Sequence, residues 1–172
     1  MKWANVTVNG ISCAALVEKD QVFPLTDVSV IDLLADLGAA ATRAKAQPSV
    51  AISEVTFQQP ILKPRKILGI GLNYAAHAKE SVSFVKSTPA NVQKWFNKQA
   101  TAAHGPYDSV DLPMVSEQLD YEAELVVIIG KTGRHVPADR AMEMVAGFAC
   151  GCDFSVRDWQ RASQPLIMRK GF

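Results

Sequence analysis

The stretch LDYEAELVVII, from Leu119 to Ile129, decides the fold because it places two carboxylates at the head of an apolar run. We predict one continuous strand here, since residues of both parities turn apolar directly after the acids. Glu122 and Glu124 are two residues apart, so their side chains share one face of that strand. A strand that is apolar on both faces is typical of a buried strand, which predicts that both acids lie at the mouth of a core.

A third acid follows a second apolar run. GFACGC, residues 147–152, ends in Asp153 after a short stretch, Pro137 to Ala146, that we predict as helical. A helical crossover between the two strands could bring Asp153 beside the first two acids. Three carboxylates without Cys or His suit Mg²⁺, Mn²⁺ or Ca²⁺ better than zinc. The alternative is that Glu122 and Glu124 lie on a solvated rim and bind nothing.

The residues around these acids resemble a known family. DYEAELVVIIGKTGRHVP and GCDFSVRDWQRAS are similar to the core of the fumarylacetoacetate hydrolase family, and FNKQATAAHGPYDSVDLP resembles its approach to the metal-binding strand. The resemblance extends over roughly Ile67 to Phe172. It implies an α+β fold, a mixed β-roll preceded by a small N-terminal α/β domain, with residues 1–60 and 66–172 as the two domains. It also implies a homodimer, and a catalytic Mg²⁺ or Mn²⁺ bound by Glu122, Glu124 and Asp153.

A His and a Glu three residues apart, His77 and Glu80, are neighbours on one face if their segment is helical. Spacing alone would favour an incidental pair on a surface helix. The stretch GLNYAAHAKE, however, resembles the family's His-Glu pair on a lid over the metal, which we expect to be mobile from about Asn73 to Pro89. The resemblance implies that Glu80 orients His77, which takes a proton from water as general base. His104 and His135 are assigned to loops.

Three further polar residues gain a role only from the resemblance. Taken alone, Arg157 and Gln160 indicate a solvated helical face and Lys170 a strand start. In the family the matching residues line the substrate pocket, and the one matching Lys170 stabilises the negative charge of a departing enolate. The chain departs from the family's usual Gly-Lys-Ser-Phe pattern at Arg169 and Gly171, which changes the local pocket.

For function the resemblance implies hydrolytic cleavage of a carbon-carbon bond in a 2,4-dioxo acid or acylpyruvate, of the kind met in the breakdown of aromatic compounds. The alternative on the same fold is a metal-dependent decarboxylase or isomerase of oxo-dicarboxylates. A third reading is a non-catalytic fragment, because family members continue beyond the position of Phe172 with further strands. We therefore expect a C-terminally truncated chain that is a poor enzyme alone, with an exposed apolar sheet face and an unpaired edge.

Composition excludes several classes of partner. Eighteen basic and seventeen acidic side chains nearly cancel, so we predict neither nucleic acid nor an anionic membrane as a partner. The small oxo acid expected as substrate is implied by the family resemblance. No run is long enough for a signal peptide or a membrane span, which predicts a cytoplasmic protein. We interpret Cys13, Cys150 and Cys152 as reduced core residues, because the last two share one strand face in poor disulfide geometry; a soft-metal site at this pair is the alternative.

The N-terminal residues alternate between apolar and polar, with turn signals between the runs. We predict short strands within residues 3–25, joined by turns at Asn9-Gly10 and Lys19-Asp20, and then a helix that starts at a Ser29 to Asp32 capping box. The remaining predicted elements follow in chain order: the helix runs to about Ala46, a strand covers Val50 to Phe57, and a linker covers Gln59 to Arg65.

Overall fold

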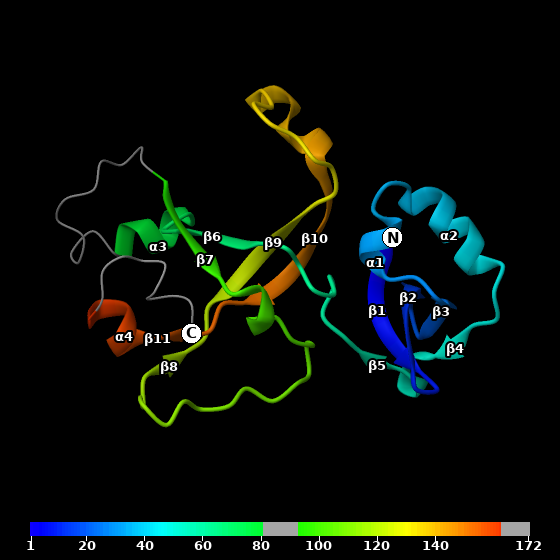
Figure 1. The fold of residues 1–172 in the computed structure, drawn as a ribbon, viewed down its shortest axis with the longest axis horizontal. Helices are drawn as coiled ribbons and strands as arrows, with labels where there is room; N and C mark the ends of the chain where they lie inside the picture. The colour runs from blue at the N-terminus through cyan, green and yellow to red at the C-terminus, as the bar shows by residue number, and fades with distance from the viewer. Residues whose placement is uncertain (81–92, 163–172) are drawn as a thin grey trace. The chain divides into compact units, whose positions relative to one another are not determined.

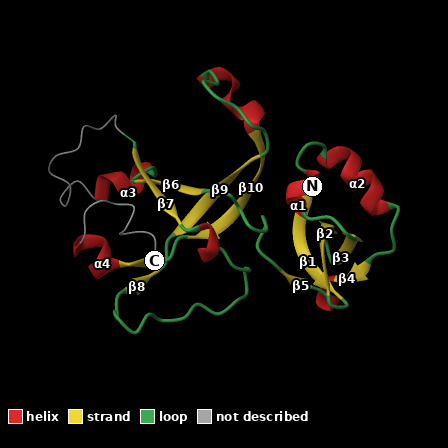
Figure 2. Cartoon of the chain, in the orientation of Figure 1, coloured by secondary structure: helices red, strands yellow, loops and turns green. Residues whose placement is uncertain are grey.

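The computed structural model describes residues 1–80 and 93–162 (Figure 1). The chain divides into two units, of which the first holds Met1–Lys63, Ala103–Asp111 and Glu122–Asp153 and the second holds Pro64–Ala102, Leu112–Tyr121 and the residues from Phe154. Helices and strands are mixed in both (Figure 2). This confirms the predicted α+β class.

A five-stranded antiparallel sheet forms the N-terminal part of the first unit, in the order β4-β3-β2-β1-β5. The predicted turns are confirmed: Asn9 and Gly10 both have positive φ, 49° and 79°, as a tight two-residue hairpin turn requires. The strands are β1 Lys2–Val8, β2 Ile11–Glu18, β3 Gln21–Leu25, β4 Val50–Ala51 and β5 Thr56–Phe57.

Two predicted elements are broken by side chains that cap the backbone. The single helix from Ser29 is wrong, because the chain forms α1 Val30–Leu33 and α2 Leu37–Lys45. Asp36 accepts a hydrogen bond from the Ala39 N–H (2.8 Å) and so starts α2 as its N-cap. The Ser29 cap is confirmed, with the Asp32 carboxylate accepting from the Ser29 N–H at 2.8 Å.

The predicted strand Val50 to Phe57 is also interrupted, by the 3-10 turn η1 Ile52–Glu54. The Glu54 carboxylate accepts from the Ala51 N–H at 2.8 Å, which stabilises this turn in place of strand pairing.

Buried side chains cover both faces of β2, the middle strand of this sheet. Ala14 and Leu16 pack against the two helices, while Cys13 and Ala15 pack on the opposite face with β1 and β3. Asn5 is fully buried in β1; its Oδ1 accepts from the Val30 N–H at 2.9 Å. Its Nδ2 donates to the Pro60 carbonyl at 2.8 Å. The chain therefore supplies its own cover for these strands.

The second unit contains two short antiparallel pairs. β6 Ile67–Gly71 pairs with β7 Lys94–Lys98, and β8 Leu119–Asp120 pairs with β11 Ser155–Val156. Gly69 is required in β6, because a Cβ there would lie 2.2 Å from the Phe96 ring. The other elements in the described part of this unit are α3 Ala75–Glu80, η3 Ala100–Ala102 and α4 Arg157–Ala162.

The stretch Leu119 to Ile129 is not one strand. It divides into β8 and β9 Ala123–Ile129, and these two pieces pair with different partners. Between them the Tyr121 N–H bonds to the Asp120 carboxylate (2.9 Å) rather than to a neighbouring strand. The local bond from side chain to backbone competes with continued pairing.

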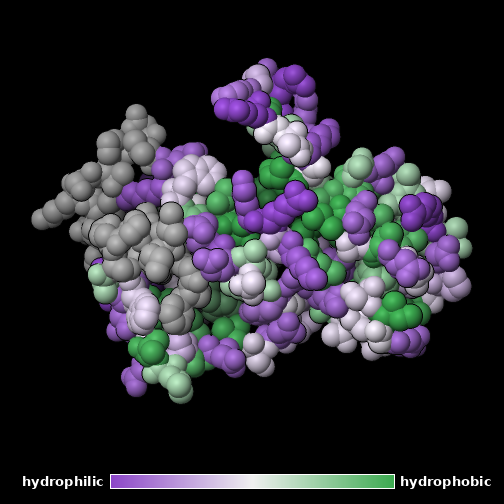
Figure 3. Space-filling model, viewed as in Figure 1, coloured by the Kyte–Doolittle hydropathy of each residue, from purple (hydrophilic) through white to green (hydrophobic). Residues whose placement is uncertain are grey.

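β9 pairs antiparallel with β10 Val145–Cys152, and the connection between them contains the 3-10 helix η4 Ala138–Met144. The predicted crossover is therefore wrong, and the connection is a long hairpin. The predicted burial of β9 is also wrong, because Leu125 is 61% exposed. Phe148 on β10 is 56% exposed, so the expectation of an exposed apolar face on this sheet is confirmed. In Figure 3 the tip of this hairpin is hydrophilic and hydrophobic atoms begin just below it.

The cysteines correct a further prediction. Only Cys13 is a core residue, whereas Cys150 and Cys152 are exposed on β10. All three are free thiols, as expected.

Candidate metal centre

The acids lie at the open end of the β9–β10 hairpin. The antiparallel register pairs Gly151 with Glu124 and Cys152 with Ala123, so the end of β10 lies beside the start of β9. The Asp153 N–H continues this pairing by donating to the Glu122 carbonyl at 2.8 Å. Asp153 is thereby fixed next to the two glutamates.

The three carboxylates converge as the sequence predicted. One oxygen from each of Glu122, Glu124 and Asp153 lies within 4.8 Å of the other two, and all three residues are half-buried. A parallel crossover would instead have left Asp153 near Ile129, roughly 20 Å away at about 3.3 Å per residue. The antiparallel hairpin is therefore the reason why the three acids meet.

This donor set fits a hard divalent cation. Two ligands of one Mg²⁺, Mn²⁺ or Ca²⁺ ion lie at most about 4 to 5 Å apart, since each metal-oxygen bond is about 2.0 to 2.6 Å long. The oxygen separations of the cluster meet this limit. Carboxylates alone, without sulfur or imidazole, favour magnesium, manganese or calcium over zinc.

Arg157 and Gln160 lie together at the start of α4. The Arg157 Nε donates to Asp120 Oδ2 at 2.8 Å, and its NH2 group lies 2.8 Å from the same oxygen. Its NH1 group donates to the side-chain oxygen Oε1 of Gln160 at 2.9 Å. The guanidinium is therefore held in one orientation by two partners in the same unit.

Asp120 is a residue that the sequence interpretation missed as a partner of Arg157. Their contact depends on the pairing of β8 with β11, in which Asp120 lies opposite Ser155. The available signal was Asp120 itself, the first acid of the DYEAE segment, which precedes the two glutamates. Ser116 fixes the same helix, since its hydroxyl donates to Asp158 at 2.7 Å.

The remaining predicted residues are placed only in part. His77 is exposed on α3, the predicted helix, and Glu80 ends that helix. The Glu80 side chain, Lys170 and most of the predicted lid from Asn73 to Pro89 lie outside the described residues. His104 and His135 lie in loops, as expected.

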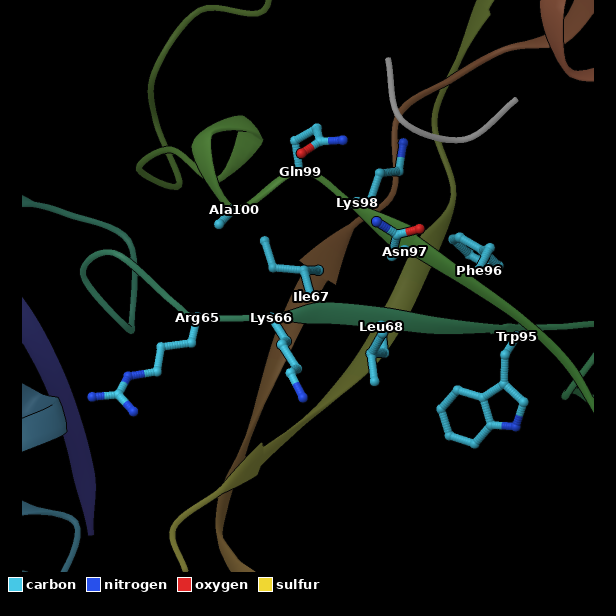
Figure 4. A pocket seen from close by; sticks show the side chains of 10 residues that line it. All are labelled: Arg65, Lys66, Ile67, Leu68, Trp95, Phe96, Asn97, Lys98, Gln99 and Ala100. Atoms are coloured by element: carbon cyan, nitrogen blue, oxygen red, sulfur yellow. The ribbon is translucent and has the colours of Figure 1, made fainter. Parts of the chain in front are cut away.

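A separate pocket of about 400 Å³ lies on the β6–β7 pair of the second unit (Figure 4). Lys66, Leu68 and Trp95 project to one side of β6 and Ile67 to the other. The lining residues are 65–68 and 95–100. None of the predicted site residues is among them.

Three carboxylates gathered at the end of a β hairpin give the chain an acidic cluster that could hold a divalent cation. The particular family follows from comparison with known proteins. The family model described as "Fumarylacetoacetate (FAA) hydrolase C-terminal" matches residues 66–172. The chain belongs to the fumarylacetoacetate hydrolase family.

A curated relative is similar over most of this chain. The rat protein "Oxaloacetate tautomerase Fahd2a, mitochondrial" is 39% identical over 156 residues, which are 89% of this chain and 49% of the relative. The chain thus spans about half the length of this relative.

Two solved structures share the fold. A fumarylacetoacetate hydrolase from psychrophilic Exiguobacterium antarcticum matches with a TM-score of 0.79 at 27% identity. A maleylpyruvate hydrolase from a Sphingobium species, in complex with manganese (II) ion and pyruvate, matches with a TM-score of 0.77 at 26% identity. Both matches cover 100% of this chain and 62% of the solved chain. They confirm the predicted fold.

Among the described residues, no helix is both long and apolar enough to cross a membrane.

Proposed function

We propose that this chain carries the metal-binding part of an enzyme that acts on enolisable 2-oxo acids. The observation that carries the proposal is the convergence of Glu122, Glu124 and Asp153 within 4.8 Å on one hairpin. These acids would hold Mg²⁺ or Mn²⁺, with Ca²⁺ as a further ion of suitable ligand preference. The manganese in the Sphingobium hydrolase makes Mn²⁺ the first ion to test.

The divalent cation, when bound, supplies Lewis-acid polarisation of the 2-oxo group, which favours the enolate. The acids that hold it repel the carboxylate of a substrate, so that group needs a cation from another element. From the resemblance to the family we assign this role to Arg157, whose guanidinium Asp120 and Gln160 hold in a fixed orientation. A planar guanidinium matches the geometry of a carboxylate.

The first candidate reaction is keto-enol tautomerisation of an oxo-dicarboxylate such as oxaloacetate. The activity named for the rat relative, oxaloacetate tautomerase, supports this isomerase alternative over carbon-carbon cleavage. The reaction moves one proton between carbon 3 and the oxygen on carbon 2. Imidazole can accept a proton on one nitrogen and donate from the other. We therefore assign the proton transfer to His77, with Glu80 orienting it and Lys170 balancing the charge of the enolate.

Hydrolysis of a 2,4-dioxo acid is the second candidate, supported by the match to the maleylpyruvate hydrolase. Here His77 would take a proton from water, and the hydroxide would add to the carbonyl farther from the carboxylate. The bond between that carbon and the adjacent CH₂ then breaks. The products are a carboxylic acid and the enolate of pyruvate, whose charge Lys170 would stabilise before protonation.

The test mixes the purified chain and Mn²⁺ with freshly dissolved enol oxaloacetate, and follows the ultraviolet absorbance of the enol. We expect decay faster than in a protein-free blank, without release of CO₂. Parallel samples contain an acylpyruvate. Release of pyruvate from the acylpyruvate would favour the hydrolase, and release of CO₂ from oxaloacetate the decarboxylase. Metal binding without any turnover would favour the non-catalytic fragment.

Two further expectations stay predictions. A homodimer is checked by light scattering of the purified chain. A cytoplasmic location is checked by fractionation of source cells, since the rat relative is named as a mitochondrial protein.

A further inference from the structure

Two exposed thiols share the strand that ends in Asp153. Cys150 and Cys152 are free and two residues apart on β10, so their side chains project from the same face. Gly151 lies between them and is paired with Glu124 in the register. The two thiols therefore lie on the face of β10 opposite to the acid cluster, in the segment that holds the cluster together.

Strand geometry keeps these thiols apart. Cα atoms two residues apart in a strand are separated by about 6.6 Å, and their parallel Cβ atoms by about the same distance. A disulfide needs a Cβ separation of about 3.5 to 4.5 Å. The two sulfurs can bond only if β10 bends between them. Gly151, at that point, is the residue type with the greatest backbone freedom.

We propose that Cys150 and Cys152 are an oxidative modification site, at which a hydroperoxide forms an intramolecular disulfide and the resulting bend separates Asp153 from Glu122 and Glu124. The effect on metal binding rests on the proposed function, whereas formation of the bond does not. An exposed, strained disulfide of this kind is readily reduced, as reversible modification requires.

The chemistry balances with hydrogen peroxide as the oxidant. One thiol, as its thiolate, attacks a peroxide oxygen; the O–O bond breaks, giving a sulfenic acid and one water. The second thiol attacks that sulfur, the S–O bond breaks, and a second water leaves as the S–S bond forms. Two electrons pass from the sulfurs to the peroxide, and both thiol protons end in the two waters.

Cys13 provides the matched control. It is 2% exposed in β2, and burial raises the pKa of its thiol. Both features slow its reaction with peroxide. A Cys13→Ala variant should therefore behave like the unchanged chain, whereas Cys150→Ser and Cys152→Ser should each prevent the bond.

The experiment treats the full chain with hydrogen peroxide and maps the product by peptide mass spectrometry. We expect loss of two hydrogen atoms on the peptide that holds residues 150 and 152, and an apparent Mn²⁺ affinity lower by at least about tenfold. Dithiothreitol should restore both. The two serine variants should keep their Mn²⁺-dependent thermal shift after peroxide.

A readout that does not need metal is amide hydrogen exchange. Bending at Gly151 should speed exchange at residues 123–126 and 149–152, because their ladder hydrogen bonds open. Unchanged exchange, a disulfide between two molecules, or separate sulfinic acids would each overturn the proposal. Absence of a Mn²⁺ shift in the reduced chain would count against the proposed metal site, and the disulfide would then stand or fall on the mapping and the exchange.

Discussion

Strands β2 and β9 are both rich in apolar residues but have opposite surroundings. Leu16 in β2 is 0% exposed, whereas Leu125 in β9 is 61% exposed. Helices α1 and α2, which follow β3 in the chain, cover one face of β2, and the other face packs with its neighbouring strands. Among residues 1–80 and 93–162, β9 has one partner strand, and a hairpin alone is marginally stable in water. Apolar sequence thus predicts that a strand forms, while its burial depends on which other segment covers it.

The largest expected effect tests this comparison directly. Leu16→Ala should lower the free energy of unfolding by about 2 to 5 kcal/mol, because it leaves a cavity in a filled core. Leu125→Ala is the matched control and should change it by less than about 0.5 kcal/mol, since the side chain is exposed. Urea unfolding measures both. Similar losses from the two substitutions would mean that the β9 face is covered in solution.

The second prediction is that a cation bound by the acids stabilises the exposed β9–β10 hairpin. Mn²⁺ at a hundred times its dissociation constant should stabilise the folded chain by about 2.7 kcal/mol. Glu124→Gln should remove this gain. Glu143→Gln, an exposed acid on η4 beside Arg140, should keep it. Thermal unfolding with and without Mn²⁺ gives the answer, and a retained shift in Glu124→Gln would contradict the metal site.

Asn5 provides the third test, on the covered side of the comparison. Asn5→Ala leaves the Val30 N–H and the Pro60 carbonyl without their buried partner. We expect the free energy of unfolding to fall by about 1 to 3 kcal/mol. Urea unfolding against the unchanged chain measures it. A neutral result would mean that water replaces the amide.

The smallest effect concerns the cap of α1, the helix that covers β2. Hydrogen bonds from the Ser29 hydroxyl and N–H lower the pKa of the Asp32 carboxyl. Its stabilising effect is therefore present above the unfolded pKa of about 3.9 and is lost as the pH falls through the lower folded value. The difference between the unchanged chain and Asp32→Ala should shrink over that range. Asp27→Asn is the control, because Asn tolerates the positive φ of 65° at that exposed position, and a difference independent of pH would rule out this linkage.

The sequence predicted which three acids converge better than it predicted the path of the chain around them. The spacing of Glu122 and Glu124 and the resemblance together identified the three acids, because residue type and parity are local properties. The direction of β10 was not predictable, since a short helical stretch between two apolar runs fits a crossover as well as a hairpin. Likewise Asp36 fits either a helix interior or an N-cap, and only packing of the two helices distinguishes these roles.

The features that could not be predicted depend on pairing between residues far apart in the sequence. The contact between Arg157 and Asp120 depends on the β8–β11 register, which joins residues 37 apart in the sequence. The break at Tyr121 arises because β8 and β9 have different partners. Neither fact leaves a periodic signal in the sequence.

The β9–β10 hairpin keeps its exposed connection far from its acid cluster. The acids lie at one end of β9 and the connection Gly130–Met144 at the other, roughly 20 Å away for seven residues of strand. The residues of that tip are mostly exposed. We expect an inserted peptide or a fluorescent label there to leave the pairing of Gly151 with Glu124 intact, because exposed loop tips tolerate insertions. The tip is therefore the place where this chain can acquire new sequence, by evolution or by engineering, without loss of its acid cluster.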